Sequence, residues 1–473
     1  MHRIFSKAAA DRTGFLQIDR CLWRYHKHSR AGRMAGALLD RVPCPKRMPK
    51  MNEAKLIACH ECDLLQWEAP LSEVGTARCG RCGAALYRSL PASFDRALAF
   101  TSAAAILFVL ANCFPIVGLW VNGTLLETTL FGAAWSLYVD GMWPIAGLVF
   151  VTTLLMPSLN IAAVIYLLVP LHVGGLPQRP ELVLRVLRHI APWGMIEVLM
   201  LGMLVALVKL QHIATVVPGV AIWAFGAVML LLAAAAVTFN PRDIWARLDS
   251  VQSDRGASYA VQASATADTA ARAGLFVCHD CGLLSKPLFA HVHAGICPRC
   301  DATLHRRKPD SLVRTWAFVF GAMVLYIPAI LLPVMVTSTL FGTQSDTILS
   351  GVVYLWNAGS WSLAAIVFIA SIVVPVLKIL SLAYLAWSTQ LRSPFIPRQR
   401  TRIYRLVEFV GRWSMLDIYV ITVLVALVQF GSVASIEAGP GAIAFGAVVV
   451  LTMFAALSFD PRLIWDAVEP EIE

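Results

Sequence analysis

Eight long apolar segments alternate with polar connections along residues 97–459 of the 473-residue chain. Each segment is long enough to cross the hydrocarbon core of a bilayer, which takes roughly 20 apolar residues in an α-helix. The pattern predicts an all-α polytopic membrane protein with eight transmembrane helices. The predicted spans are 97–119, 142–170, 192–211 and 220–239, followed by 313–336, 360–387, 413–431 and 441–459.

The second group of four spans repeats the first. Residues 193–245 and 413–465 align without a gap at 22 identities in 53 positions, which chance does not produce. Each group follows two Cys-x-x-Cys pairs, so a small four-Cys module and a four-helix bundle occur twice in tandem. The predicted domains are a basic arm at 1–52, a ribbon at 53–92, a bundle at 93–245, a linker at 246–274, a second ribbon at 275–308, a second bundle at 309–467 and a tail at 468–473.

The charges of the connections predict the orientation. Residues 171–191 and 388–412 carry nine Arg between them, whereas 120–141, 337–359 and 431–440 carry no Lys or Arg. By the positive-inside rule, both termini, both four-Cys modules and the Arg-rich connections are cytoplasmic. Four spans return each copy to the side from which it started, so the repeat is parallel rather than inverted.

Two connections on the opposite side, 128–143 and 347–361, are apolar and contain Gly, Trp and Tyr. This composition predicts short helices that lie at the outer leaflet. An ordinary interfacial belt of aromatic residues is the alternative.

Composition also fits a membrane protein, since 58% of the residues are hydrophobic and 14% are charged. The formal net charge is +10, but residues 1–50 hold 12 Lys or Arg against three Asp and supply most of it. We interpret this arm as a disordered segment or as an over-called translation start, with Met51 as the true one. The arm lacks the interleaved aromatic residues of a nucleic-acid-binding segment, so no nucleic-acid partner is expected.

Eight Cys form two sets with the spacing of a zinc ribbon. In each set, two Cys-x-x-Cys pairs are separated by 16 or 15 residues, and the four thiolates suit one tetrahedral ion. A module this small buries too little core to fold without metal, and a cytoplasmic location argues against structural disulfides. We predict two zinc ions per chain, held by Cys59, Cys62, Cys79 and Cys82 and by Cys278, Cys281, Cys297 and Cys300.

A rubredoxin-like iron centre, thiol-disulfide chemistry at one Cys pair and an empty vestigial site are the alternatives to zinc. Four Cys already complete a tetrahedral shell, so the neighbouring His residues are interpreted as surface residues. These are His60, His279, His291, His293 and His305. Cys21, Cys44 and Cys113 fit no pattern and receive no role.

Polar residues inside the predicted spans are costly and mark candidate functional sites. Lys378 lies deep in the sixth span, where an unpaired Lys costs on the order of 3 kcal/mol, so it must face protein or water. Ser371 lies on the same helix face. Ser414 and Asp417 on the seventh span and Thr452 on the eighth complete a candidate cluster.

The first repeat differs from the second at this cluster. Asn160 aligns with Lys378 and Glu197 with Asp417, so the acid is retained and the base is not. We interpret Lys378 as a titratable, proton-coupling switch, with the other cluster residues and Glu197 as further candidates. The alternatives are snorkelling or a structural ion pair with Asp417 for the Lys, and helix packing or bonding to the preceding turn for the hydroxyl residues.

In combination, these features resemble the paraquat-inducible protein A family, which includes the LetA proteins. The resemblance rests on the two four-Cys ribbons, each ahead of four spans, and on Asn-Cys-Phe-Pro at 112–115, Met-Pro-Ser at 156–158, Val-Pro-Val-Leu-Lys at 374–378 and Trp-Ser-Met-Leu-Asp at 413–417. It covers about residues 51–467. It implies an inner-membrane protein of Gram-negative bacteria that works with an MCE-domain tunnel protein in the periplasm and moves phospholipid or a similar lipid between the two membranes.

Two other functions remain open from the residues themselves. One is a membrane redox protein that uses the four-Cys centres as electron carriers. The other is an ion or proton channel, for which more polar residues along one continuous helix face would be expected. The chain has no Walker-type phosphate loop, so an ATPase motor is not supported, and no enzyme activity is expected.

Overall fold

The computed structural model describes residues 56–68, 71, 75–90, 92–121, 124–210, 215–253, 268–286, 294–339, 342–357, 359, 361–427 and 434–468. The chain divides into two units, Met1–Lys55 and Leu56–Glu473, and every described residue belongs to the second. The predicted basic arm at 1–52 therefore lies outside the described residues. Residues 254–267 of the predicted linker and 469–473 of the tail lie outside them as well.

The first membrane helix of each repeat ends at a proline. α2 (Ser93–Cys113) stops because Phe114 precedes Pro115 and adopts an extended backbone, with φ −102° and ψ 154°. α10 (Ser311–Leu331) stops in the same way at Leu332, ahead of Pro333, with φ −78° and ψ 150°. A proline therefore ends the first long helix of each copy, at equivalent places in the two repeats.

The remaining helices follow in the same order in both repeats. In the first they are α3 (Leu130–Val139), α4 (Trp143–Phe150), the π-helix η1 (Val151–Leu155), α5 (Met156–Val173), α6 (Pro180–Ile190), the 3-10 helix η2 (Ala191–Trp193), α7 (Ile196–Leu210), α8 (Val220–Thr238) and α9 (Pro241–Ser253). In the second they are α11 (Ile348–Asn357), α12 (Trp361–Phe368), the π-helix η3 (Ile369–Val373), α13 (Val374–Gln390), α14 (Pro397–Gly411), the 3-10 helix η4 (Arg412–Met415), α15 (Leu416–Leu427), α16 (Pro440–Ser458) and α17 (Leu463–Asp466).

Among the described residues, seven helical segments are long and apolar enough to cross a membrane. They are Ser93–Cys113, Trp143–Val173, Pro180–Leu207, Val220–Thr238, Ser311–Leu331, Ala364–Gln390 and Pro440–Ser458. The predicted span at 413–431 forms η4 and α15, and its last residues lie outside the described part of the chain. The eighth transmembrane helix therefore stays a prediction.

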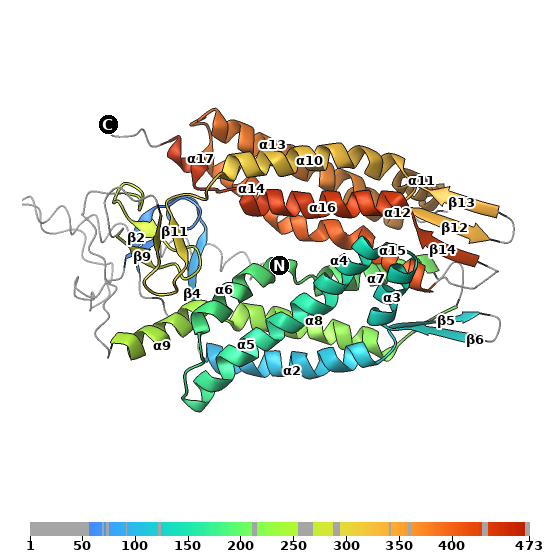
Figure 1. The fold of residues 1–473 in the computed structure, drawn as a ribbon, viewed down its shortest axis with the longest axis horizontal. Helices are drawn as coiled ribbons and strands as arrows, with labels where there is room; N and C mark the ends of the chain where they lie inside the picture. The colour runs from blue at the N-terminus through green and yellow to red at the C-terminus, as the bar shows by residue number, and fades with distance from the viewer. Residues whose placement is uncertain are drawn as a thin grey trace, which may run out of the picture. The chain divides into compact units, whose positions relative to one another are not determined.

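Helix pairing within each repeat follows the same scheme. α2 packs along α8 and against α5, and α10 packs along α16 and against α13 (Figure 1). The repeats meet where α7 lies against α15, and α15 also packs on α3. The main apolar core contains residues of both repeats, such as Phe225, Leu199, Tyr419 and Phe445, so the two copies share one interior.

Two small β-sheets stand at one end of the helices, which the all-α prediction did not include. β5 (Val117–Val121) pairs with β6 (Thr124–Thr128) and with β7 (Thr215–Pro218), both antiparallel. β12 (Met335–Thr339) pairs in the same way with β13 (Gly342–Asp346) and β14 (Ala434–Ala438). We refer to them as the outer sheets, and each joins the segment after a repeat's first helix to the segment before its last (Figure 1).

A glycine lets each outer sheet join the last helix of its repeat. A Cβ atom at Gly219 would lie 2.2 Å from the Pro115 carbonyl oxygen, and one at Gly439 would lie 2.2 Å from that of Pro333. Real Cβ atoms do not approach a backbone oxygen this closely, so only glycine fits. The same two glycines donate backbone hydrogen bonds to Ile116 and Val334, at 2.9 and 2.8 Å.

The short helices predicted in the connections 128–143 and 347–361 are present as α3 and α11. Thr129 caps α3, because its hydroxyl accepts a hydrogen bond from the Gly132 N–H at 3.0 Å. Both helices expose large aromatic side chains: Phe131, Trp135 and Tyr138 on α3, and Tyr354 and Trp356 on α11. This placement suits a membrane interface, where an aromatic ring meets both hydrocarbon and water.

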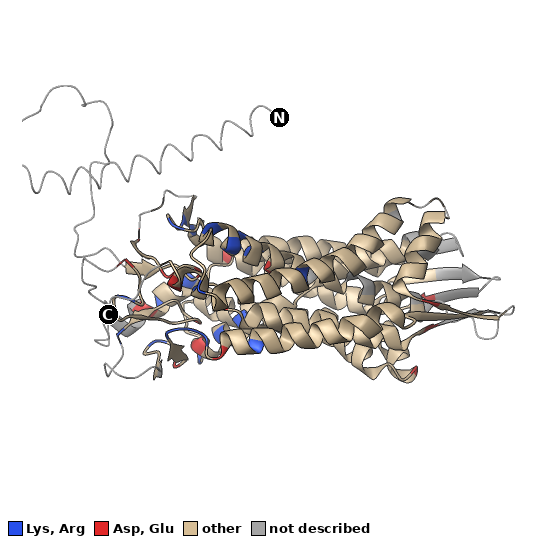
Figure 2. Cartoon of the chain, turned by 90° about the horizontal axis from the view of Figure 1, so that it is seen from above, with Lys and Arg blue, Asp and Glu red and all other residues tan. Residues whose placement is uncertain are grey.

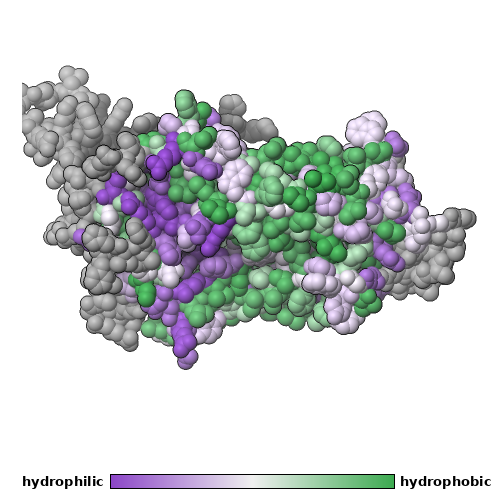
Figure 3. All heavy atoms as spheres, turned by 45° about the horizontal axis from the view of Figure 1, so that its top comes forward, coloured by the Kyte–Doolittle hydropathy of each residue, from purple (hydrophilic) through white to green (hydrophobic). Residues whose placement is uncertain are grey.

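Charged side chains separate from apolar ones along the helices. Lys and Arg gather at the end with the four-Cys modules, opposite the outer sheets (Figure 2). Between the two ends, the face in view is a broad apolar band (Figure 3). This distribution agrees with helices that are buried in a bilayer and charges that lie outside it.

Each repeat has a sharp corner after its last long apolar helix. The corners are Phe-Asn-Pro-Arg at 239–242, after α8 stops at Thr238, and Phe-Asp-Pro-Arg at 459–462, after α16 stops at Ser458. In the second repeat, Arg462 is buried and donates from Nη2 to Asp460 Oδ2 at 2.9 Å. Burial by itself raises the pKa of Asp460, but Arg462 and the Lys308 N–H outweigh it and hold that pKa below its usual value. Asp460 therefore remains charged and fixes the corner.

We expect Asp460→Asn to destabilise the protein, because it leaves the buried Arg462 without its counter-charge, at a cost of about 3 kcal/mol. The pKa of the Asp460 carboxyl is lower in the folded protein than in the unfolded chain, where it is about 4. The stabilisation that the charged carboxylate provides is therefore complete above that pH and is lost as the pH falls below it towards the folded-state pKa. The midpoint of thermal unfolding in detergent should drop by several degrees at pH 7 and converge with wild type in acid. Equal midpoints at pH 7 would contradict this account of the corner.

Candidate metal centres and membrane polar cluster

The first four-Cys module is built from two hairpins. β1 (Leu56–Ala58) pairs with β2 (Leu65–Trp67), β3 (Gly75–Arg78) pairs with β4 (Ala85–Ser89), and each hairpin turn carries one Cys-x-x-Cys pair. In the turns, the Asp63 N–H donates to the Cys59 carbonyl and the Gly83 N–H to that of Cys79, both at 2.9 Å. These bonds fold each Cys pair into a knuckle that points both sulfurs to one side.

The second module repeats this design. β8 (Phe276–Val277) pairs with β9 (Leu284–Ser285), and β10 (Ala294–Ile296) pairs with β11 (Thr303–His305). The residue after the last Cys of each knuckle has a left-handed backbone, at Asp63, Gly83, Gly282 and Asp301, with φ between 53° and 74°. Gly83 and Gly282 therefore suit the knuckle turns, because glycine adopts a positive φ without strain.

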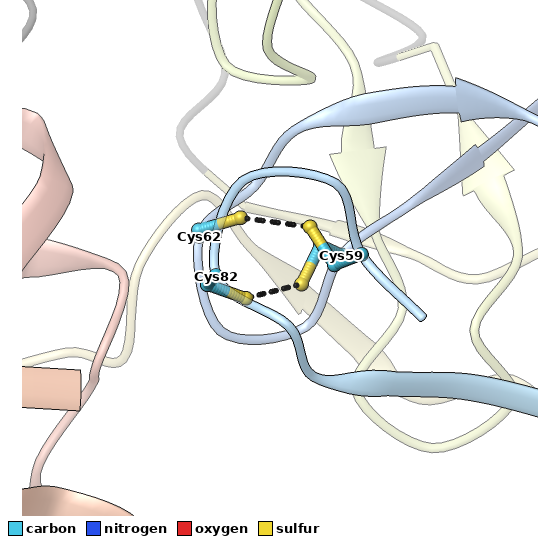
Figure 4. A group of neighbouring side chains, drawn as sticks. Cys59, Cys62 and Cys82 are labelled. Atoms are coloured by element: carbon cyan, nitrogen blue, oxygen red, sulfur yellow. Dashed lines mark hydrogen bonds between the residues drawn. The ribbon is translucent and has the colours of Figure 1, made fainter. Parts of the chain in front are cut away.

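The four sulfurs of each module converge on one point. Cys59 Sγ lies 3.5 Å from Cys82 Sγ, and Cys62 Sγ lies 3.4 Å from Cys79 Sγ (Figure 4). In the second module the corresponding distances are 3.5 Å and 3.6 Å, for Cys278 with Cys300 and Cys281 with Cys297. All four ligand atoms of each set lie within 4.8 Å of one another, so each set can hold a metal ion.

The electrostatics of these sulfurs favour a bound cation. Hydrogen bonding with the other three Cys of each set raises the pKa of Cys62 and of Cys281, whose thiols donate, and lowers the pKa of Cys79 and of Cys278, which accept. Four thiolates this close repel one another, so they ionise together only when a cation compensates their charge. The residues present therefore fit a four-thiolate metal site.

Histidine is not part of either cysteine set. His60 is exposed, as expected of a surface residue. His279 is half-buried and lies 2.9 Å from Arg462 Nη2, because the second ribbon packs on the corner of the second repeat. Burial and the nearby Arg462 lower the pKa of His279 to about 4. His291 and His293 lie outside the described residues.

Each ribbon docks on the helices of the other repeat and also contacts the corner of its own repeat, at Arg242 for the first ribbon and at Arg462 for the second. Arg405 on α14 donates from Nε to Glu61 Oε2 at 2.8 Å and from Nη2 to the Cys82 carbonyl at 3.1 Å. The apolar core beneath the first centre contains Cys59, Cys62 and Cys79 together with Tyr404, Phe459, Ile464 and Trp465 of the second repeat. The first ribbon thus lies under the second set of helices, although it precedes the first set in the chain.

The second ribbon makes the equivalent contacts with the first repeat. Arg185 on α6 lies 3.2 Å from Asp280 Oδ2 and also donates to the Cys300 carbonyl. Its apolar core joins Cys278, Cys297 and Cys300 to Leu184, Leu187, Ile244 and Trp245. Arg185 and Arg405 occupy equivalent positions in the two repeats, so this exchange of ribbons is symmetric.

Cation–π contacts reinforce both docking sites. The Arg81 guanidinium lies 4.5 Å from the Trp465 ring centroid, and that of Arg299 lies 5.1 Å from the Trp245 ring centroid. Each Arg stands between the two Cys of a knuckle, and each Trp ends the repeated C-terminal motif. Sequence reasoning assigned these Trp only to the repeat, since no local pattern reveals which ribbon would meet them.

Lys378 lies where the prediction placed it, inside the protein. It is 2% exposed, and its Nζ lies 3.4 Å from the Gly411 carbonyl at the end of α14. Asp417 lies on α15, and its side chain is outside the described part of the chain. The ion pair between Lys378 and Asp417 therefore stays a prediction. Asn160, the equivalent of Lys378 in the first repeat, is half-buried on α5, and Glu197 is exposed on α7.

The predicted hydroxyl residues are buried on elements that contact one another. Ser371 on η3 donates to the Val367 carbonyl at 2.7 Å, and Thr452 on α16 donates to that of Val449 at 2.9 Å. Ser414 on η4 has a buried hydroxyl with no hydrogen-bond partner among the described residues. η3 packs against η4, and η4 against α16, so the three elements meet beside α13. The back-bonds of Ser371 and Thr452 agree with the packing alternative, and the free Ser414 hydroxyl leaves a polar group available in the cluster.

Two π-helical turns precede the prolines of the second and sixth spans. Pro157 and Pro375 lack an N–H and would crowd the carbonyl four residues earlier, so the helix widens there. Met156 and Val374 accordingly donate to the carbonyls five residues back, at Val151 and Ile369. The Val-Pro-Val-Leu-Lys motif therefore places Lys378 about one helical turn after the π-helical turn η3.

A buried contact between the repeats was not predicted. The Tyr419 hydroxyl on α15 donates to Thr152 Oγ1 on η1 at 2.9 Å, and both side chains are buried. A cavity of about 10 Å³ lies beside Tyr419, between β5, α3, α7 and α15. A hydroxyl inside an apolar span was the available sequence signal, but its partner lies 267 residues away in the chain.

The chain is similar to known proteins over most of its length. The family model described as paraquat-inducible protein A matches residues 94–249 and 312–469. The intermembrane transport protein PqiA of Escherichia coli strain K12 is 35% identical over 425 residues, which cover 89% of this chain and 98% of that protein. No solved structure matches the chain.

Two further relatives extend over most of the chain. The lipophilic envelope-spanning tunnel protein A of Escherichia coli strain K12 is 30% identical over 411 residues, 87% of this chain and 91% of the relative. A probable intermembrane transport protein of Haemophilus influenzae is 28% identical over 428 residues, 90% of this chain and 100% of the relative. Together with the seven apolar helices, these similarities identify a multi-pass membrane protein whose relatives are named as transport proteins.

Proposed function

Because this chain belongs to the paraquat-inducible protein A family, we propose that it is the inner-membrane component of a system that moves phospholipid between two membranes. The observation that carries the proposal is its similarity, over nearly the whole length of both chains, to a protein named for intermembrane transport. Transport of lipid by a multi-pass protein requires no covalent chemistry, so the proposed role is not enzymatic.

The proposed partner is an MCE-domain protein that forms a tunnel across the periplasm. The outer sheets are the part of the described chain that extends beyond the helices on the side opposite the ribbons (Figure 1). They present open strand edges at β6, β7, β13 and β14, which are able to receive a partner's backbone. We assign the partner contact to this end.

The proposed orientation puts the ribbons in the cytoplasm. Its support is the concentration of Lys and Arg at the ribbon end (Figure 2), since positive charge is retained on the cytoplasmic side. In this orientation, α3 and α11 lie at the outer leaflet, next to the proposed tunnel partner. We further propose that the chain crosses the membrane eight times, in two tandem bundles of four helices.

Reporter fusions test this topology. Fusions after residues 130 and 345 should be active on the periplasmic side, and those after 180, 265 and 400 on the cytoplasmic side, because the Arg-rich connections stay inside. Alkaline phosphatase and green fluorescent protein activities measure the two locations. A reversed pattern at two of these five sites would refute the orientation.

Zinc is the proposed metal, one ion in each ribbon. Four thiolates in a closed tetrahedral set with no open position are the ligand set of a structural zinc site, and bound zinc would hold the two knuckles of a ribbon together. The runner-up function, a membrane redox protein, uses the same sulfurs to hold iron. Zinc is colourless, whereas a four-thiolate iron centre absorbs visible light, so the two are readily distinguished.

Purified protein should contain close to two zinc ions per chain by elemental analysis, because the eight thiolates form two complete sets. Cys278→Ser or Cys297→Ser should remove one ion, lower the yield and lower the thermal midpoint, because the ribbon folds around its metal. Cys113→Ser, at an exposed Cys outside both sets, is the matched control. Iron with visible absorption, or less than one metal of any kind per chain, would reject the zinc assignment.

Proton coupling through Lys378 is the proposed energy step. Its support is burial of a cation whose described polar contact is one backbone carbonyl, an arrangement that costs on the order of 3 kcal/mol in a membrane. A group held at such cost is able to exchange its proton as the helices move around it. Ser371, Ser414, Asp417, Thr452 and Glu197 are the further candidates for the proton path.

Lys378→Ala should leave the protein folded and inserted but abolish phospholipid movement, because it removes the titratable charge. Transfer of isotope-labelled phospholipid between the two membranes, in cells that carry only the variant, measures the effect. Asn160→Ala in the first repeat is the matched control and should be mild.

A purely structural role for Lys378 predicts a different outcome. Its removal would then strand a buried acid and reduce the abundance of the protein. The double variant Lys378→Met with Asp417→Leu would restore both abundance and phospholipid movement, since an apolar pair replaces an ion pair without loss. An abundant, active double variant would reject the switch.

A further inference from the structure

The arginine fork between the first ribbon and α14 is a rigid joint. Arg405 donates from Nε to both carboxylate oxygens of Glu61, at 2.9 and 2.8 Å, and from Nη2 to the Cys82 carbonyl at 3.1 Å. Charge-assisted contacts of a planar guanidinium restrict both distance and orientation. Glu61 stands between Cys59 and Cys62, and Cys82 belongs to the same set, so Arg405 is joined directly to the backbone around the metal centre.

α14 lies between that ribbon and the membrane helices. The Tyr404 ring lies 5.7 Å from the Phe459 ring, and its hydroxyl contacts the Ala456 carbonyl of α16 at 3.4 Å. The Thr401 hydroxyl accepts a hydrogen bond from Trp465 Nε1 at 3.1 Å. These contacts hold α14 along its length, so a displacement of the ribbon is transmitted to the helix rather than absorbed by a loop.

The C-terminal end of the same helix touches Lys378. Gly411 follows Arg405 by six residues, about 9 Å along a helix axis. Its carbonyl lies at the C-terminal end of α14, where the α-helical bonding ends and the 3-10 helix η4 follows directly. The backbone dipoles of α14 give this end partial negative charge. Lys378 Nζ lies 3.4 Å from that oxygen, and a Cβ atom at Gly411 would lie 3.3 Å from Lys378 Cε, so the side chain rests directly on the backbone.

We propose that Arg405 is a positioning residue for Lys378: by fixing α14 to the first ribbon, it sets the place of the Gly411 carbonyl that holds the buried ammonium group. The first ribbon then holds α14, and with it the Gly411 carbonyl beside Lys378, in place, in addition to its proposed binding of a metal ion. Folding of a cytoplasmic ribbon is thereby connected to a group inside the membrane. The inference rests on the function proposed for Lys378.

The first repeat supplies a natural comparison. Arg185 on α6 contacts Asp280 and the Cys300 carbonyl, as Arg405 contacts Glu61 and the Cys82 carbonyl. The residue equivalent to Gly411 is Ala191, and the one equivalent to Lys378 is the uncharged Asn160. Both repeats therefore have an arginine that fixes a helix to a ribbon. In the second repeat the end of that helix contacts a buried Lys, whereas in the first repeat the equivalent residue is Asn160. Loss of Arg405 and loss of Arg185 should therefore have different consequences.

The test compares Arg405→Ala with Arg185→Ala in the full-length, metal-loaded protein in lipid nanodiscs. Acetic anhydride acetylates accessible amines, and peptide mass spectrometry gives the rate at each Lys. We expect the acetylation rate of Lys378 to rise about tenfold or more in Arg405→Ala and to change by less than about twofold in Arg185→Ala. Lys308, which contacts the Leu457 and Phe459 carbonyls, is the internal reference and should react as in wild type.

Two further variants keep the test decisive if Arg405→Ala does not accumulate. Glu61→Gln weakens the fork but keeps a hydrogen-bond acceptor, and Arg405→Lys keeps the charge but loses the two-sided grip on Glu61 and Cys82. Both should give Lys378 rates between those of wild type and the Ala variant. An unchanged Lys378 rate in all of these variants, or an equal rise in Arg185→Ala, would overturn the positioning role.

Phospholipid movement in cells separates this inference from the proposed function. It should fall more in Arg405→Ala than in Arg185→Ala, in step with the Lys378 rate. If the wild-type chain moves no phospholipid, the proposed function fails, while the acetylation comparison still decides whether Arg405 positions Lys378. A higher Lys378 rate with undiminished movement would show that the position of Lys378 does not control transport and would reject the coupling.

Discussion

A membrane interior offers no hydrogen-bond partner, and the arrangement of this chain follows from that constraint. Backbone groups in the spans are satisfied by helices. Hydroxyl groups in the spans bond to carbonyls three or four residues earlier, as at Thr101, Thr315 and Thr422. Strands, by contrast, occur at the two ends, in the ribbons and the outer sheets. Lys378 departs from this arrangement, since the polar contact of its ammonium group in the described part of the chain is the carbonyl end of another helix.

Duplication produced two similar halves that the structure uses unequally. Both repeats have a π-helical turn ahead of a proline, an outer sheet closed by a glycine, and a ribbon held by an arginine fork. The halves differ at the centre, where Lys378 faces the end of α14 and Asn160 occupies the equivalent place on α5. In the second repeat, α15 also packs on α3 of the first repeat. The two scaffolds are alike, and the buried Lys lies in the second repeat.

The exchange of ribbons joins the halves at the end of the helices where the ribbons lie. Each ribbon contacts the helices of the other repeat, so neither repeat is complete without the ribbon of its neighbour. At the other end, the Tyr419–Thr152 hydrogen bond and the packing of α7 on α15 join them within the membrane. This arrangement resists separation of the two copies, while the π-helical turns leave local breaks in the second and sixth spans.

Local patterns in the sequence determined the apolar spans, the tandem repeat, the two four-Cys sets and the polar residues of the sixth span. Helix length, hydropathy and ligand spacing depend on neighbours in the chain, and they are readable there. The family resemblance drew on the same short-range motifs and was confirmed. The outer sheets were missed because each needs a strand from the far end of its repeat, such as β7 beside β5. Tertiary structure alone decided the ribbon exchange, the contact of His279 with Arg462 and the contact of Lys378 with the Gly411 carbonyl. Each depends on which distant surfaces pack together, and no periodicity along the chain indicates that packing.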